Sequence, residues 1–254
     1  MTIWSENLVS KTKIVASKIN NELQYRRSLL LARGALFKLN SQNNIVLKTD
    51  AWNEALGEDD YICKILPKNS FCYSVDISKP VIEAAKINYS TSDSVSFEVG
   101  DLTSLRFDSN TFDSIYSPST LDHMPPQKVQ QSLNELYRVL KPRGRAEITF
   151  DNALSFWLYA LIFRLLLSYN SSRSWYPLTK WECIKMLRKS GFKILCSDAI
   201  LLYPTVGGVM RLQRSILSSA VNTLLQISKS MENRSKFLNV FKAELVFIVE
   251  KADK

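Results

Sequence analysis

The chain has 254 residues, 46% of them hydrophobic and 22% charged, with 7 glycines and 8 prolines. This composition excludes long disorder and a fibrous repeat. The 33 basic and 24 acidic residues give a net charge of +9, but residues 1–47 hold 7 basic and 2 acidic groups, 48–152 hold 11 and 16, and 153–254 hold 15 and 6. We therefore predict an acidic centre between two basic flanks, not a uniformly basic protein.

Short apolar runs rich in β-forming residues alternate with stretches of helical spacing. The strands that we predict, in chain order, cover residues 45–50, 71–77, 95–99, 112–117, 145–151, 192–198 and 244–250. Helical spacing covers residues 80–90, 126–141 and 178–191. This alternation predicts an α/β fold with a doubly wound, mostly parallel seven-stranded sheet and helices on both faces.

Carboxylates stand at or just after the ends of four predicted strands, at Asp50, Asp76, Asp101 and Asp151. Sheets of this kind bind their ligands at the carboxyl ends of the strands. A single aspartate between a strand and a helix often serves only as a helix cap. Four of them in one chain favour a ligand site over capping alone.

The segments around these carboxylates resemble those of the class I S-adenosylmethionine-dependent methyltransferases, over roughly residues 43–197, with motifs like those of methyltransferase type 11. VDISKPVIEAAK (75–86) resembles the second-strand motif of the family. The resemblance implies that Asp76 binds the two ribose hydroxyls of the cofactor, with Ile77 beside it. It also implies a Rossmann-like sheet whose last strand is antiparallel.

Three further segments carry the resemblance. VSFEVGDLTSLRF (95–107) is similar to the third-strand motif, which implies that Asp101 accepts a proton from the adenine amino group and that Leu102 lies beside the ring. FDSIYSPSTLDHM (112–124) resembles the fourth strand, whose end at Ser117 would face the methionine part of the cofactor. The last segment, ELYRVLKPRGRAEITFDN (135–152), resembles the next helix, turn and strand, with Pro142 and Gly144 shaping the turn.

The chain departs from the family after its first strand. The usual GxGxG loop, which lets backbone N–H groups approach the cofactor, is replaced by KTDAWNEALGEDD (48–60), whose only glycine is Gly57. AWNEAL favours a helix, so we predict that Asp50 is its N-cap and that it begins at Ala51. Either the Lys48–Asp50 edge and the helix terminus hold the cofactor, or the site has degenerated. We expect S-adenosyl-L-methionine binding to be retained, with Asp50 among the binding residues.

His123, the sole histidine, follows the fourth predicted strand in STLDHM, and the resemblance places it near the methyl group. An unperturbed histidine titrates near neutrality, which makes His123 our candidate for a general base. Methyl transfer requires a base only where the acceptor is a hydroxyl or a similarly weak acid. The family commonly carries a histidine here without that role, so a structural role is the alternative.

We expect one methyltransferase domain over residues 1–254. It comprises an N-terminal helical segment (1–42), a cofactor-binding core (43–198), a helical cap insertion (199–243) and a last strand (244–254). Residues 153–167 are strongly apolar but contain Arg164, and a membrane-spanning helix needs about 20 apolar residues. We therefore expect a buried helix or a pocket wall there, with peripheral membrane contact as the alternative.

The cysteines indicate a reduced protein without a bound metal. Cys63, Cys72, Cys183 and Cys196 form no CxxC pair and have no histidine nearby in the sequence, so neither a zinc site nor a disulfide framework is expected. We predict that all four are core thiols. Residues 1–20 lack the continuous apolar stretch of a signal peptide, so we expect a cytoplasmic protein.

Three functions remain open from the sequence. Aromatic residues near the segments outside the common sheet favour a methyltransferase for a small-molecule acceptor. The basic flanks favour an RNA or protein methyltransferase, but the positive residues are scattered and the chain has no NPPY-like motif or RNA-binding module, so we do not expect nucleic acid as the partner. The absent glycine loop favours a methyltransferase-like binding protein without activity. The oligomeric state is left open.

Overall fold

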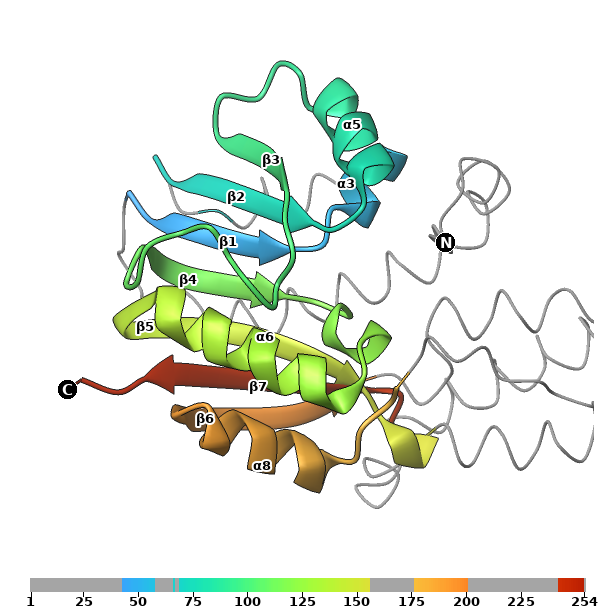
Figure 1. The fold of residues 1–254 in the computed structure, drawn as a ribbon, viewed down its shortest axis with the longest axis vertical. Coiled ribbons are helices and arrows are strands. Elements are labelled where there is room, and N and C mark those ends of the chain that lie inside the picture. Colours follow the sequence, from blue (N-terminus) through green and yellow to red (C-terminus); the bar gives the residue numbers. More distant parts are fainter. Residues whose placement is uncertain (1–42, 58–65, 67–68, 156–175, 201–241, 254) are drawn as a thin grey trace, which may run out of the picture.

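The computed structural model of the protein describes residues 43–57, 66, 69–155, 176–200 and 242–253 (Figure 1). Seven strands form one sheet in the order β3-β2-β1-β4-β5-β7-β6. The strands are β1 (Ile45–Thr49), β2 (Phe71–Asp76), β3 (Val95–Val99), β4 (Phe112–Ser117), β5 (Leu140–Asp151), β6 (Phe192–Ile200) and β7 (Glu244–Lys251). Within the described sheet, every strand pairing is parallel except those of β7 with β5 and with β6. The predicted mostly parallel sheet with an antiparallel last strand is confirmed.

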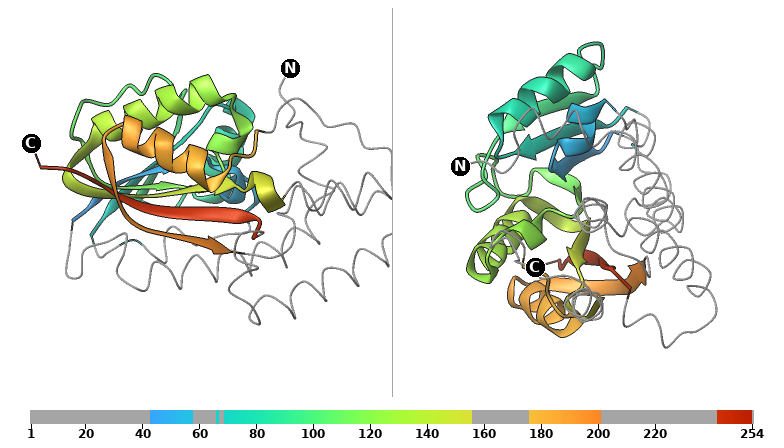
Figure 2. Two further views of the ribbon diagram at one scale, coloured as in Figure 1. Left: turned by 90° about the horizontal axis from the view of Figure 1, so that it is seen from below. Right: turned by 90° about the vertical axis from the view of Figure 1, so that its right-hand side faces the viewer.

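Helices cover both faces of this sheet, as the sequence predicts. The helices are α3 (Trp52–Leu56), α5 (Lys79–Asn88), the 3-10 helix η1 (Leu121–His123), α6 (Pro126–Val139) and α8 (Lys180–Lys189). Successive strand residues point to opposite faces, so Val46 packs with residues of α3 and α5, whereas Leu47 packs with residues of α6 and α8. Figure 2 shows α6 and α8 side by side on their face of the sheet.

Local sequence explains where these helices begin. Pro80 and Pro126 stand in the first turns of α5 and α6, where the N–H that proline lacks has no helical partner. The α8 helix begins with a capping box, in which Thr179 accepts from the Glu182 N–H and Glu182 accepts from the Thr179 N–H. Each helix then presents an apolar stripe to the sheet.

The junction between α6 and β5 differs from the prediction. The helix ends at Val139 and the strand begins at Leu140, although helical spacing predicted a helix to residue 141 and a strand from 145. The pairing with β4 shifts register here, and Arg143 has a left-handed φ of 60°. A Cβ on Gly144 would lie 2.8 Å from the Lys141 carbonyl oxygen, so the bulge requires glycine at this position.

Some expectations fall on other parts of the chain. Residues 1–42, and residues 201–241 of the cap insertion, lie outside the described residues, so the single-domain division stays a prediction. Of 153–167, only 153–155 are described, and membrane contact through this segment likewise stays a prediction. Among the described residues, no helix is both long and apolar enough to cross a bilayer.

The expectation that all cysteines are core thiols is wrong at one position. Cys72 and Cys183 are buried, whereas Cys196 is exposed. Cys196 lies where the pairing of β6 with β7 shifts register, between Ile194 and Cys196, so the regular alternation of inward and outward side chains breaks there. Cys63 lies outside the described residues.

Candidate cofactor-binding site

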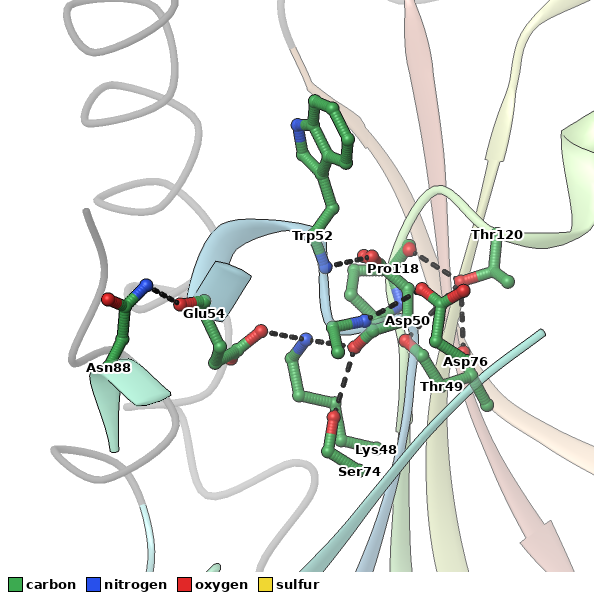
Figure 3. Close-up of polar contacts among 11 residues, drawn as sticks. Lys48, Thr49, Asp50, Trp52, Glu54, Ser74, Asp76, Asn88, Pro118 and Thr120 are labelled. Carbon is green, nitrogen blue, oxygen red and sulfur yellow. Dashed lines mark hydrogen bonds and ion pairs between the residues drawn. The ribbon is translucent and has the colours of Figure 1, made fainter. Parts of the chain in front are cut away.

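The carboxyl ends of adjacent strands bring the predicted residues together. Thr49 ends β1, Asp76 ends β2 and Ser117 ends β4, and these three strands are neighbours in the sheet. The Ala51 N–H, just after β1, donates to the Asp76 carboxylate. Figure 3 shows Asp50, Asp76, Thr49 and Thr120 gathered at this edge. The sheet order thus makes one site from segments that lie far apart in the sequence.

The carboxylate of Asp76 is held on both sides by backbone donors. Its Oδ2 accepts from the Ala51 N–H at 3.1 Å and its Oδ1 accepts from the Ser78 N–H at 2.8 Å. Burial and the charge of Asp50 raise the pKa of Asp76, against the opposing effect of these hydrogen bonds. An ionised carboxylate has about four acceptor positions, so about two remain on Asp76 for further donors. The next residue, Ile77, has 65% of its surface exposed.

Asp50 forms a tight turn in place of a glycine loop. Its φ of 80° lies in the left-handed region, which costs an ordinary L-residue about 1–2 kcal/mol and which aspartate adopts more readily than most. The Asp50 N–H donates to the Val75 carbonyl at 2.8 Å, and its Oδ1 accepts from the Trp52 N–H at 2.7 Å. The predicted helix start at Ala51, with Asp50 as its N-cap, is wrong by one residue, because α3 begins at Trp52 with Ala51 at the N-cap position.

A buried ion pair lies directly beneath this turn. Lys48 Nζ donates to the Asp50 carbonyl oxygen and to Glu54 Oε2, the latter at 2.9 Å, and both side chains are at most 3% exposed. Burial acts to lower the pKa of Lys48, but the charges of Glu54 and Asp50 raise it above its ordinary value. Sequence reasoning missed this pair, because a strand residue and a helix residue six positions later have no characteristic spacing.

A side chain from α5 completes the short helix. Asn88 Nδ2 donates to the carbonyls of Glu54 and Ala55 at 3.0 and 2.9 Å, which satisfies acceptors that a helix end leaves without partners. Gly57 follows with a left-handed φ of 65°, a common way for a helix to end. The α3 helix is thereby anchored at both ends despite its five residues.

The end of β3 brings Asp101 next to β2. The Gly100 N–H donates to the Asp76 carbonyl at 3.0 Å, and Asp101 Oδ1 accepts from the N–H and the hydroxyl of Thr103, both at 2.8 Å. Although burial acts to raise the pKa of Asp101, these hydrogen bonds lower it below its ordinary value. Asp101 is therefore an ionised acceptor at neutral pH. Leu102 is buried in the core, and its place beside an adenine ring stays a prediction.

Hydroxyl groups link the ends of β1 and β4. Thr49 Oγ1 donates to Ser117 Oγ at 2.8 Å and lies 2.9 Å from Thr120 Oγ1. Thr120 also donates to the Pro118 carbonyl at 2.8 Å. Ser117 is completely buried. That Ser117 faces the methionine part of a cofactor stays a prediction. The contact that the structure shows for its side chain is with Thr49 of β1.

The loop after β4 is held by a residue from the last strand. Glu244 Oε1 accepts from Ser119 Oγ at 3.0 Å and from Thr149 Oγ1 at 2.7 Å. The Ser119 N–H in turn donates to Thr149 Oγ1 at 2.8 Å. Sequence reasoning missed Glu244, because its partners lie 95 and 125 positions away and are set by strand register. Asp151 pairs with Glu244 in this register and is buried.

His123 ends η1 beside this loop, and nearly half of its side chain is exposed. Its Nε2 lies 3.7 Å from Asp122 Oδ2, within reach of an ion pair when the imidazole is protonated but too long for a hydrogen bond. Asp122 is buried. The catalytic role of His123 stays a prediction. Among the described residues, no three His, Cys, Asp or Glu side chains are grouped to hold a metal ion.

Comparison with known families matches residues 55–148 to a family described as a methyltransferase domain. Among curated proteins, the sterol 24-C-methyltransferase ERG6 of Saccharomyces cerevisiae is 35% identical over 82 residues, which are 32% of this chain. The matched stretch spans only 20% of the yeast protein.

Solved structures share the fold at low identity. The [4+2]-cyclase SpnF has a TM-score of 0.59 and 15% identity, over 90% of this chain and 81% of its own. A SAM-dependent methyltransferase from Methanosarcina mazei has a TM-score of 0.54 and 14% identity, over 88% and 98% of the two chains. The CurJ carbon methyltransferase has a TM-score of 0.56 and 17% identity, over 88% and 52%.

The family match begins at Ala55, just beyond the turn in which this chain lacks glycines. The mostly parallel sheet and its antiparallel last strand are those that the sequence resemblance implied, and carboxylates stand at the end of β2 and just after β3. Residues 55–148 of this chain thus match a methyltransferase-domain family, and the chain shares its fold with solved methyltransferase structures.

Proposed function

We propose that this protein binds S-adenosyl-L-methionine and transfers its methyl group to a small-molecule acceptor. The observation that carries the proposal is the arrangement of Asp76. Backbone N–H groups occupy one position on each carboxylate oxygen and fix its plane. The two positions that remain suit the two adjacent hydroxyls of a ribose, a pair of charge-assisted hydrogen bonds that a neutral side chain reproduces poorly.

Neighbouring residues suit the adenine end of the cofactor. Ile77 and Val99 follow or end adjacent strands and expose 65% and 45% of their surfaces, so they offer apolar area to a flat ring. Asp101, ionised at neutral pH, would accept the proton of an exocyclic amino group. A ring bound against the exposed side chain of Ile77 would remove apolar surface from water, and this burial favours binding.

The chemistry requires alignment more than reactive side chains. The acceptor atom forms a bond to the methyl carbon as the carbon–sulfur bond breaks, and the electron pair of that bond stays on sulfur, which becomes a neutral thioether. Holding both reactants in line supplies much of the rate enhancement. If the acceptor carries a proton, His123, which is half-exposed in the segment that follows β4, would receive it.

The acceptor class rests on different support. The name of the yeast relative describes methyl transfer to a sterol, a small apolar molecule, but the similarity covers one fifth of that protein. One structural neighbour is named as a cyclase, so the fold by itself does not carry methyl transfer. The proposal therefore depends on the carboxylates, and direct binding tests it.

Isothermal titration with S-adenosylhomocysteine, the product form of the cofactor, is the first experiment. We expect saturable binding with one site per chain, and the absence of binding at millimolar concentration would leave only the inactive, methyltransferase-like protein. Transfer of a labelled methyl group to a panel of apolar small molecules then tests the acceptor class. An RNA methyltransferase would instead show RNA binding that weakens steeply with added salt.

A further inference from the structure

The turn at Asp50–Ala51 is fixed by side chains that do not themselves reach the site. The Asp50 carbonyl oxygen accepts from Lys48 Nζ and from Ser74 Oγ, the latter at 3.2 Å. This orientation of the peptide group aims the Ala51 N–H at Asp76 Oδ2. Figure 3 shows the chain of contacts from Glu54 through Lys48 to the Asp50 carbonyl. The orientation of Asp76 therefore depends on a bond that begins at Lys48.

Burial excludes a direct role for Lys48 in ligand binding. Its side chain is 3% exposed, and its ammonium group lies between the Asp50 carbonyl and Glu54. Glu54 supplies the compensating negative charge, so the pair adds no net charge beneath the site. A buried ion pair costs desolvation energy on both partners, and replacement by apolar residues is often neutral or stabilising. Stability alone therefore gives little reason for charges at these positions.

We infer that Lys48 is a positioning residue for cofactor binding, which holds the left-handed Asp50 turn through its carbonyl and so orients Asp76, with Glu54 as the counter-ion that keeps Lys48 in place. This inference rests on the proposed function. The contact of Lys48 with the Asp50 carbonyl, here called the clamp, takes the place of the glycine loop. Removal of the clamp lowers cofactor affinity and leaves the fold intact.

The decisive variant replaces both charges at once, as Lys48→Met with Glu54→Leu. The single change Lys48→Met would leave a buried carboxylate without its cation and destabilise the protein, whereas the double variant removes both charges and keeps apolar volume. We expect the double variant to melt within a few degrees of the wild type. Its affinity for S-adenosylhomocysteine falls about ten- to hundredfold, as for the loss of a charge-assisted hydrogen bond.

Lys141→Met is the matched control. Lys141 Nζ also pairs with a carboxylate, Asp113 Oδ1, at 2.8 Å, and Asp113 in turn accepts from the first N–H of β1, at Ile45. This second pair adjoins the same strand at its opposite end. Its loss should leave S-adenosylhomocysteine affinity unchanged, which separates the position of the clamp from any general effect of removing a lysine.

Each outcome decides between the alternatives. A stable double variant with weakened binding supports the clamp. A stable double variant with wild-type affinity overturns it, and so does a double variant that no longer folds, because the pair would then serve the fold as a whole. Wild-type protein that binds no S-adenosylhomocysteine overturns the proposed function and this inference together. Wild-type binding that is insensitive to the double change overturns this inference alone.

Discussion

Replacing Asp76 by alanine tests the centre of the proposed site. The change removes the two acceptor positions offered to a ribose, each worth about 1.5–3 kcal/mol as a hydrogen bond to a charged group. Because Asp76 is only partly buried, water weakens both bonds, and we take the lower end of the sum, about 3 kcal/mol. Since each 1.4 kcal/mol is about a tenfold change, S-adenosylhomocysteine affinity should fall about hundredfold.

The same substitution also affects stability, so the two effects must be measured separately. The N–H groups of Ala51 and Ser78 lose their acceptor, which destabilises the fold by about 1–3 kcal/mol. Isothermal titration gives the affinity, and urea unfolding shows that the variant is folded at the titration temperature. Asp93→Ala is the control, since Asp93 is an exposed aspartate preceding β3, at the opposite edge of the sheet. Unchanged affinity in a folded Asp76→Ala protein would refute the assignment of the ribose site.

Three further predictions concern the protonation of Asp76, the role of His123 and the bulge at Gly144. Because the pKa of Asp76 is raised, its carboxylate takes up a proton at a higher pH than an ordinary aspartate does. On acidification, S-adenosylhomocysteine affinity should therefore begin to fall at a higher pH than an ordinary aspartate would give, whereas protonation itself favours the folded state. Isothermal titrations across pH check this, and Asp76→Asn should abolish the dependence. His123→Ala should leave cofactor affinity unchanged and reduce methyl transfer only to acceptors that lose a proton, as measured by single-turnover kinetics; equal loss for all acceptors contradicts a base. Gly144→Ala should destabilise the protein by about 1–3 kcal/mol in urea unfolding, because its Cβ meets a backbone oxygen, and wild-type stability would contradict the bulge geometry.

The sheet was predictable because its signals are local. Each of the seven predicted strands is present, and the carboxylates after β2 and β3 occupy the edge at which a parallel sheet binds ligands. The start of β5 was not predictable in the same way. Leu140 continues the apolar stripe of α6, and only the left-handed Arg143 and the close approach at Gly144 show that the chain has already entered the sheet.

The contacts that shape the site were harder to predict. The sequence places Lys48 at the edge of the predicted site, but nothing in its local spacing indicates an ammonium group buried against a carbonyl. Glu244 holds Ser119 across 125 positions of sequence, a contact that exists only because β7 enters the sheet beside β5. Such interactions depend on strand order and register, which hydrophobic patterning alone leaves open.

The place of β7 in the sheet also constrains the order in which the protein assembles. In the described sheet β6 pairs only with β7, and β7 follows residues 201–243 in the chain. During synthesis, β6 therefore leaves the ribosome with no neighbour to pair with, and α8 is the element nearest in sequence that can cover it. Late, non-local strand pairing is slow and leaves an unpaired edge exposed. Nascent chains that stall between residues 200 and 244 should be the species most prone to aggregation and chaperone binding.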